Sequence, residues 1–246
     1  MTPHPPRSRE LPPEHRRTWL IRTMVAVVAA VGLIVGGPWF YAQFLANAPA
    51  EPLALTTPTP EASATSQAPT PLKLSDLEGT WLVGEGSQAG YRLGEVLSGQ
   101  PVTVVGRTEV VGGTVVVQAG ALMVADIVVD TATIVTDESA RDAYFRRALN
   151  TTDFPQATFS LTARVDLSAV IGSTGPVTLE APGSLTFHGA TQAVTATLQV
   201  QRSATGVEVA GTIPVVLADF GLEPPDLGFV TVEPTGTVEM LLALTR

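Results

Sequence analysis

A stretch in the middle of the chain, TFSLTARV at residues 158–165, decides the fold, because its apolar and polar side chains alternate. A period of two places Phe159, Leu161 and Val165 on one face of an extended strand and the polar side chains on the other. The segment around Leu185 and Phe187 alternates in the same way. Both segments therefore predict β-strands that bury one face.

Similar short segments recur through residues 73–246 and are separated by glycine-containing turns. Valine and threonine, which favour pleated and half-buried positions, supply 49 of these 174 residues. We expect strands at residues 80–83, 89–96, 102–111, 114–118, 122–129, 158–167, 177–179, 183–188, 193–202, 207–218 and 229–245. The pattern predicts an all-β domain of eight or more antiparallel strands, folded as a sandwich or as a closed barrel.

One segment of this domain is expected to be helical. Residues 136–149 begin with acidic side chains and end with Arg146 and Arg147, as the helix dipole favours. One apolar face is formed by Ala140, Tyr144, Phe145, Ala148 and Leu149. The sequence therefore predicts one short helical excursion from the sheet.

The N-terminal part of the chain differs from the rest in charge. Residues 1–18 contain four arginines and five prolines and are expected to form a disordered basic cytoplasmic tail. Residues 23–50 contain no charged residue, and a helix over residues 19–46 would be about 40 Å long, enough to cross a ~30 Å hydrocarbon core. The sequence thus predicts a single transmembrane helix.

The orientation of this helix follows from the charges beside it. Arginines precede it and Glu51 follows it, which places the N-terminus in the cytoplasm. Small residues at positions 46–50 also match a signal-peptide cleavage site, so secretion after cleavage is the alternative. In both cases the C-terminal domain is extracytoplasmic.

Residues 47–72 have the composition of a linker, with six prolines, six alanines and seven serines or threonines. Such a segment buries too little apolar surface to order itself, which predicts a disordered linker. The domain that follows, residues 73–246, has nine basic and nineteen acidic residues. We therefore expect a domain that is tethered at the cell membrane, without electrostatic attraction to anionic lipids.

The composition excludes several functional classes. The chain has no cysteine, and His188 is the only histidine of the domain, so no metal site, redox cofactor or thiol nucleophile is expected. The net charge of -9 argues against nucleic-acid binding. Glu109, Asp126 and Asp130 are the acids that an enzyme could use, but their spacing indicates no active site. We therefore expect a protein that is not an enzyme.

Five motifs follow one another along the domain: SQAGYRL at 87–93 with VGRT at 105–108, the segment 129–142, FPQATF at 154–159, GSLTFHGAT at 183–191 and LADFGLEP at 217–224. In this order they resemble the YceI-like, polyisoprenoid-binding domain family over residues 76–244. The resemblance implies a lipocalin-like antiparallel barrel whose elongated apolar lumen holds a polyisoprenoid or a similar long-chain amphiphile as bound cargo. It implies no catalytic residues.

The resemblance also suggests which side chains meet the ligand. Those expected to line the lumen are Tyr91, Phe145, Phe159, Leu185, Phe187 and Phe220. Those expected at the rim, near a polar headgroup, are Arg141, Asp142 and His188. Each has a structural alternative, which is core packing for the apolar residues and an exposed ion pair or a hydrogen-bonded histidine for the polar ones.

Three function classes remain from this reasoning, of which an enzyme acting on a lipid is the least favoured. The first is a membrane-tethered extracytoplasmic lipid-binding protein that sequesters or carries such an amphiphile, and the second is a filled barrel that displays a surface to a partner in the cell envelope. Large side chains at every inward position would indicate the filled barrel, whereas the many valines and alanines here leave room for a cavity. The sequence indicates no oligomeric state.

Overall fold

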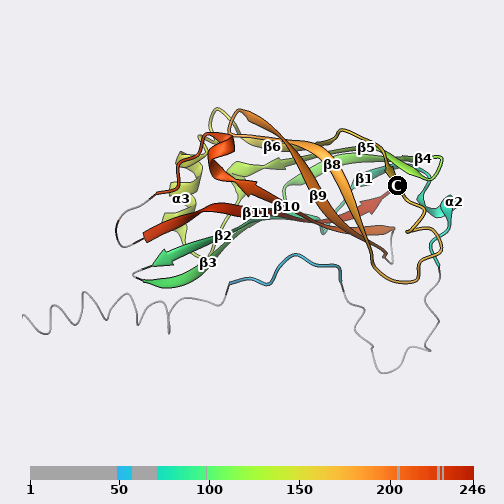
Figure 1. The fold of residues 1–246 in the computed structure, drawn as a ribbon, viewed down its shortest axis with the longest axis horizontal. Helices are drawn as coiled ribbons and strands as arrows, with labels where there is room; N and C mark the ends of the chain where they lie inside the picture. Colours follow the sequence, from blue (N-terminus) through green and yellow to red (C-terminus); the bar gives the residue numbers. More distant parts are fainter. Residues whose placement is uncertain (1–48, 57–70, 98, 204–205, 226–227, 229) are drawn as a thin grey trace, which may run out of the picture.

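The computed structural model describes residues 49–56, 71–97, 99–203, 206–225, 228 and 230–246 (Figure 1). The tail and the transmembrane helix expected at residues 1–18 and 19–46 lie outside these residues, as does most of the expected linker. Among the described residues, no helix combines the length and the apolar character that crossing a membrane requires.

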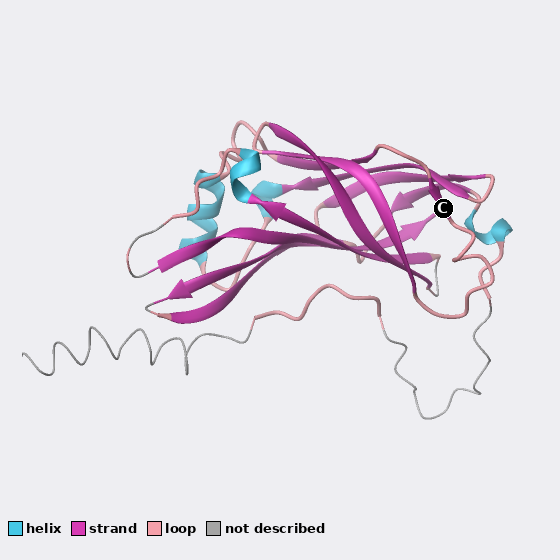
Figure 2. Cartoon of the chain, in the orientation of Figure 1, coloured by secondary structure: helices cyan, strands magenta, loops and turns pink. Residues whose placement is uncertain are grey.

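Antiparallel strands make up most of the domain (Figure 2). The strands are β1 (Gly79–Val83), β2 (Gln88–Leu97), β3 (Gln100–Thr108), β4 (Val111–Gln118), β5 (Ala121–Asp130), β6 (Gln156–Leu161), β7 (Val165–Asp166), β8 (Val177–Phe187), β9 (Ala190–Arg202), β10 (Val207–Val216) and β11 (Val230–Thr245). The helical elements are α2 (Leu74–Leu77), η2 (Thr131–Thr133), α3 (Ser139–Ala148) and η3 (Leu217–Phe220).

The sheet closes on itself. Its strands follow the order β1-β4-β5-β6-β8-β9-β10-β11, and β1 pairs again with β11 through Leu82 with Thr245 and Val83 with Leu244. Eight antiparallel strands thus form a ring. The prediction of an all-β closed barrel of about eight strands is confirmed, and the sandwich is excluded.

Strand β11 has two neighbours on one side because it is sixteen residues long. Its last residues pair with β1, whereas residues 230–241 pair with β2, which in turn pairs with β3. The β2–β3 hairpin therefore extends the wall at the end of the barrel where α3 lies (Figure 1). Val135, between η2 and α3, is joined to this hairpin by a bridge to Arg107.

Helix α3 matches the predicted helical excursion, within three residues at its start and one at its end. Its first turn is capped by the Glu138 carboxylate, which accepts a hydrogen bond from the N–H of Ala140 at 3.2 Å. Arg146 and Arg147 lie in its last turn, where the helix dipole favours positive charge.

The alternating stretch at residues 158–165 is interrupted, which differs from the single strand expected there. Strand β6 ends at Leu161, and Ala163 is exposed, not buried with Phe159. The N–H of Thr162 donates to the C=O of Pro182 at 3.0 Å, but a proline has no N–H to donate in return. Pairing with β8 therefore stops, and the chain resumes as β7 against β5.

The end of the barrel near α2 is closed and packed. Trp81 is buried there, and its indole N–H donates to the C=O of Leu77 at 2.8 Å. Arg246 covers the face of the Trp81 ring, with its guanidinium carbon 4.3 Å from the ring centre. Leu72, at the end of the expected linker, is also buried here and pairs through its backbone with Gly172 and Ser173.

A further part of the expected linker, residues 49–56, is bound to the barrel through Ala50, Glu51, Leu53 and Thr56, which composition alone does not predict. Residues 49–56 have no regular secondary structure and run along the outside of the barrel, drawn in blue in Figure 1. Polar side chains of the barrel wall bind their backbone, as described below.

Candidate functional site

The end of the barrel next to α3 is hollow. A cavity of about 570 Å3 lies between α3, β2, β11 and residues 222–225. In the opposite half of the barrel the enclosed space is only about 80 Å3. The interior is thus divided into a packed half and a hollow half, and the hollow half is within the size range of small-molecule sites.

Helix α3 turns its apolar face toward this space. The cavity is lined by Tyr144 and, one helical turn later, Ala148, with Phe145 next to Tyr144. Ala140 and Leu149 line it as well. An apolar helix face normally packs against other side chains. Here it borders a cavity, so an apolar ligand could take the place of the missing protein contacts.

Tyr91 is held against the cavity wall by a cross-strand glycine. Its partner on β3 is Gly106, and a Cβ atom at Gly106 would lie 2.5 Å from the Tyr91 ring, so the ring covers the glycine directly. On its other side, the ring stacks on Phe145, with ring centres 4.8 Å apart. Burial raises the pKa of the Tyr91 hydroxyl above its ordinary value. Tyr91 and Phe145, both predicted lumen residues, are therefore brought together at the cavity.

The remaining predicted lumen residues are divided between the two halves. Leu185 and Phe187 on β8 line the large cavity, whereas Phe159 lines the small one. Phe220 lines neither cavity and is fully buried behind Phe187, with ring centres 4.0 Å apart. Four of the six side chains thus meet the large cavity, and Phe159 and Phe220 support it from the core.

A charged pair is set into the otherwise apolar wall. Arg141 on α3 reaches Glu95 on β2 at 3.4 Å and Asp137 at 2.7 Å. Glu95 was not among the predicted site residues. It shares the inward face of β2 with Tyr91 and Leu93, so a charge at an inward position of an alternating strand was the signal that could have identified it.

The cavity reaches solvent beside α3. Glu138, Tyr144 and Glu223 all line it and are also exposed; Tyr144, for instance, keeps 43% of its surface accessible. We call this side, between α3 and residues 221–225, the open end of the barrel. A ligand can enter there without opening the sheet.

Two of the three predicted rim residues have structural roles. Asp142 is buried and accepts hydrogen bonds from the N–H and the hydroxyl of Thr136 at 2.8 and 2.7 Å, which fixes the chain before α3. His188 has a φ of 51° in the turn between β8 and β9, and its Nδ1 lies 2.9 Å from the C=O of Phe220. Among the three, only Arg141 lines the cavity.

The acids that an enzyme could use are not gathered at the cavity. Asp126 is exposed on β5, and Glu109 is bonded to Gln88 outside the lumen. Asp130 caps η2 through the N–H of Ala132. In the described ranges, no three acidic or histidine side chains are grouped as a metal site would need.

The geometry defines a class of protein. A closed antiparallel barrel, packed at one end and holding an apolar cavity open at the other, is a barrel that can enclose a small apolar ligand. The model of the YceI-like domain matches residues 63–244, so the chain belongs to the YceI-like domain family. The family that the five motifs resemble is thereby confirmed.

Solved structures to which this chain is similar include three from bacteria. A polyisoprenoid-binding domain from Saccharophagus degradans is 22% identical, with a TM-score of 0.51 over 68% of this chain and 98% of that one. BcnA of Burkholderia cenocepacia is 16% identical (TM-score 0.49; 63% and 96% covered), and a YceI protein of Campylobacter jejuni is 12% identical (TM-score 0.45; 57% and 84% covered). A comparison with curated proteins gave no match.

Proposed function

We propose that this protein binds a long-chain amphiphile of the polyisoprenoid kind, with the chain of the ligand in the large cavity and its polar end at the open end of the barrel. The protein does this outside the cytoplasm, as a carrier or a store that stays tethered to the membrane. Its ligand is cargo, and no reaction is involved.

The observation that carries this proposal is the apolar face of α3 beside an unfilled space of about 570 Å3. Phe145 packs on Tyr91 on one side, but no protein side chain fills the cavity side of this helix face, and that costs the stability that burial would give. A ligand chain that fills the space restores it, at ~4 kcal/mol for each five-carbon isoprene unit before the ordering costs. The structurally similar Saccharophagus degradans domain is described as polyisoprenoid-binding, which agrees with this chemistry.

The charges at the open end favour an uncharged headgroup. Glu95, Glu138 and Glu223 line the cavity. Of the two arginines in the lining, Arg92 pairs with Glu239 on the outside of the wall, which leaves Arg141 to face these carboxylates. Arg141 is already paired with Glu95 and Asp137. A phosphate would add negative charge beside these carboxylates, so an alcohol or another neutral polar end is the better match.

The tether is proposed from the sequence. Residues 19–46 have the length and the flanking charges of a single-pass helix with a cytoplasmic N-terminus. The barrel domain would then work at the outer surface of that membrane, next to a lipid phase from which an apolar chain could be taken up.

Native mass spectrometry and solvent extraction of the full chain, purified from membranes, test the proposal. We expect a stoichiometric prenyl or acyl species, and micromolar or tighter rebinding of a prenyl alcohol after delipidation. Ala148→Trp fills the cavity from α3 and should abolish binding. Ala143→Trp, on the same helix but away from the cavity, is the matched control and should bind normally. Wild-type protein that takes up neither prenyl nor acyl chains would refute the proposal.

A further inference from the structure

Two carboxylates are buried on the outside of the barrel wall, where side chains normally face water. Glu239 on β11 points outward because its neighbour Met240 points into the core, yet its side chain is only 4% exposed. Glu208 on β10, next to the inward-facing Val209, is 8% exposed. Burying a carboxylate costs several kcal/mol unless it is paired or hydrogen-bonded. Something must therefore cover and satisfy both groups.

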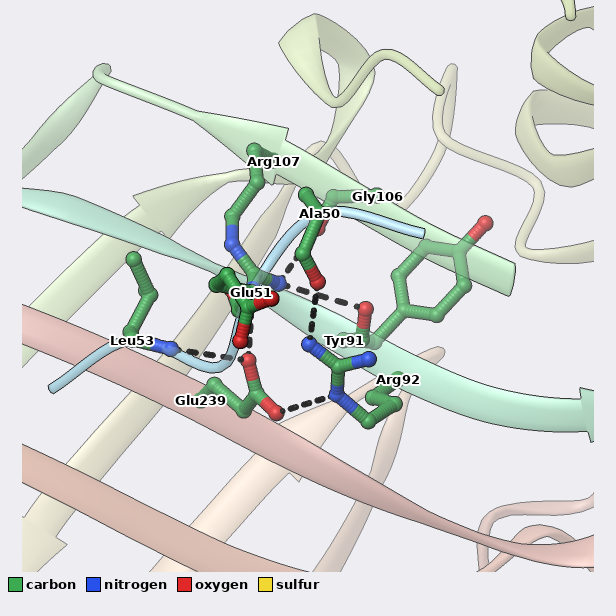
Figure 3. A network of polar contacts seen from close by, with 8 residues as sticks. All are labelled: Ala50, Glu51, Leu53, Tyr91, Arg92, Gly106, Arg107 and Glu239. Carbon is green, nitrogen blue, oxygen red and sulfur yellow. Dashed lines mark hydrogen bonds and ion pairs between the residues drawn. The ribbon is translucent and has the colours of Figure 1, made fainter. Parts of the chain in front are cut away.

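The cover is the segment 49–56, which we call the clasp (Figure 3). The N–H of Leu53 donates to Glu239 at 3.4 Å, and both the N–H and the hydroxyl of Thr56 donate to Glu208 at 2.9 Å. Gln201 on β9 donates to the C=O of Thr56 at 3.0 Å and to Glu208 at 2.7 Å. The two carboxylates thus hold the clasp by its backbone.

Two arginines hold the other end of the clasp. Arg92 donates to the C=O of Ala50 at 2.7 Å and to Glu239 at 2.8 Å, and Arg107 pairs with Glu239 and reaches the C=O of Glu51 at 3.5 Å. Burial lowers the pKa of Arg107, and Glu239 opposes this shift. These charged groups bind backbone carbonyls and amides on one line, as a peptide-binding groove would.

A glycine makes room for this arrangement. In the sheet, Gly90 on β2 lies directly between Glu239 on β11 and Arg107 on β3. Because Gly90 has no side chain, Arg107 can reach across the strand to Glu239, with the clasp above them (Figure 3). The groove is therefore built into three neighbouring strands.

The direction of the clasp follows from the strand register. Arg92 lies opposite Thr237 of β11. Glu239 is two residues further along β11, and Ala243, which lies opposite Glu208, is further along still. From Ala50 to Thr56, the clasp therefore runs along β11 from the hollow half toward the packed half. Its N-terminal end, which leads to the expected membrane helix, points toward the open end of the barrel.

We propose that the clasp is an orientation device, which docks the barrel close to the membrane with its open end facing the bilayer. The inference rests on the proposed function, because it takes residues 19–46 as the anchor. With the clasp bound, a ligand enters the cavity from the lipid phase across a short gap. Without it, the barrel would tumble on a long tether.

The lengths of the chain segments support this geometry. From residue 46 to Ala50, the chain spans at most ~14 Å. From Arg92 to the end of β2 at Leu97, five residues span about 17 Å toward the open end. The rim of the barrel can therefore reach the membrane surface. A fully free linker over residues 47–72 would instead place the barrel ~30 Å away on average, in any orientation.

The test uses the full chain, which contains no cysteine and so accepts single labels. Val96→Cys, 40% exposed near the rim, and Ser75→Cys, exposed on α2, place a fluorophore at either end of the barrel. Each protein is reconstituted in phosphatidylcholine vesicles that contain an acceptor lipid, and energy transfer to the bilayer is measured. We expect much stronger transfer from position 96 than from position 75.

A clasp variant and a matched control test whether the clasp causes the difference in energy transfer between the two labels. Leu53→Pro with Thr56→Pro removes both N–H groups that bind the carboxylates, and it should reduce the difference between the two labels, because only the contacts of the arginines with Ala50 and Glu51 remain. Ala54→Pro, at an exposed position between them, should preserve the difference. All three substitutions lie outside the barrel, and thermal unfolding of each variant verifies that the barrel is intact.

Each outcome has one meaning. Equal transfer from both ends of the wild type, or a difference that the double proline variant leaves undiminished, overturns the clasp. Failure of the full chain to float with the vesicles refutes the anchor and this inference together. A clear difference in a protein that binds no prenyl alcohol supports the clasp and refutes only the proposed ligand.

Discussion

Two aromatic side chains, one in each half of the barrel, are positioned by glycines on neighbouring strands. The Tyr91 ring covers Gly106 at the hollow half, and the Phe159 ring lies against Gly183 at the packed half, where a Cβ atom would be 2.3 Å from the ring. The absence of a side chain on one strand thus fixes the rotamer on the next. Residues of this kind determine the shape of the cavity without touching its ligand.

Gly106→Ala tests this arrangement. The new Cβ atom would lie 2.5 Å from the Tyr91 ring and 2.8 Å from Ile134, so the ring must move into the cavity. We expect a loss of about 1–3 kcal/mol in the free energy of unfolding and weaker prenyl alcohol binding. Gly112→Ala, where a Cβ atom would meet nothing within 4 Å, is the control and should leave binding unchanged in the same urea and titration experiments.

The buried Tyr91 hydroxyl should give a pH signal. Burial raises its pKa, so Tyr91 should form phenolate only at a pH above the ordinary value of about 10. Because the folded pKa is the higher one, the associated stability is complete below the unfolded pKa and is lost as the pH rises through the folded pKa. Phenolate absorbance should show a transition at a pH above the ordinary tyrosine range. Tyr91→Phe should remove this transition, and denaturant should move it to about pH 10. A Tyr91→Phe profile identical to the wild type would contradict this assignment.

At the scale of elements, α3 differs from an ordinary amphipathic helix because its apolar face lines a cavity. Its N-terminal end is fixed by Glu138 and by Asp142 with Thr136, so the helix keeps its place although its apolar face borders empty space. Arg141, one turn after Asp137, carries the ion pair to Glu95 across the open end. The helix therefore acts as a wall of the site, and its charges select what enters.

Glu95→Gln tests this selection. Removing one carboxylate and releasing Arg141 should improve the binding of a prenyl phosphate, relative to a prenyl alcohol of equal length, by about 1 kcal/mol. Competition titrations with both ligands measure the change. Glu109→Gln removes an exposed acid that does not line the cavity and should alter neither affinity. A wild type that already prefers the phosphate would contradict the proposed headgroup.

At the scale of the molecule, the fold was predictable because its signals are local and repeated. Alternation around Phe159 and Leu185, turn glycines and the charge pattern of residues 136–149 each report on a few neighbouring residues. The family motifs then distinguished the barrel from a sandwich. The cavity, in contrast, is a property of the interior as a whole: nothing near Phe159 in sequence reveals that it lies in the packed half while Leu185, its partner across the strands, lines the hollow one.

Two polar features were missed for a related reason. Glu95 shares a face of its strand with Tyr91 and Leu93, but which face of this strand points inward is decided by the closed barrel. Residues 49–56 look like linker until Glu208 and Glu239, more than 150 residues away, supply their partners. Sequence patterns describe how a segment could fold by itself, and these contacts depend on the closed barrel.

The ligand should also govern the stability of the whole domain. Under the proposed function only the folded barrel binds the prenyl chain, so ligand at 100 times its Kd should add about 2.7 kcal/mol to the free energy of unfolding. Delipidated protein should accordingly melt at a lower temperature and recover on addition of a prenyl alcohol. Ala148→Trp should show the same melting temperature with and without the ligand. An upward shift in that variant would place binding elsewhere than in the cavity.

The division of the interior has a consequence for how such proteins diversify. Trp81 and its neighbours around the small cavity pack against one another, while the side chains near α3 border open space. Substitutions of the side chains that line the large cavity can therefore enlarge or shorten the lumen while the contacts around the small cavity stay the same. A single scaffold could in this way be adapted to cargo of different lengths, by natural variation or in the laboratory, while its closed end stays unchanged.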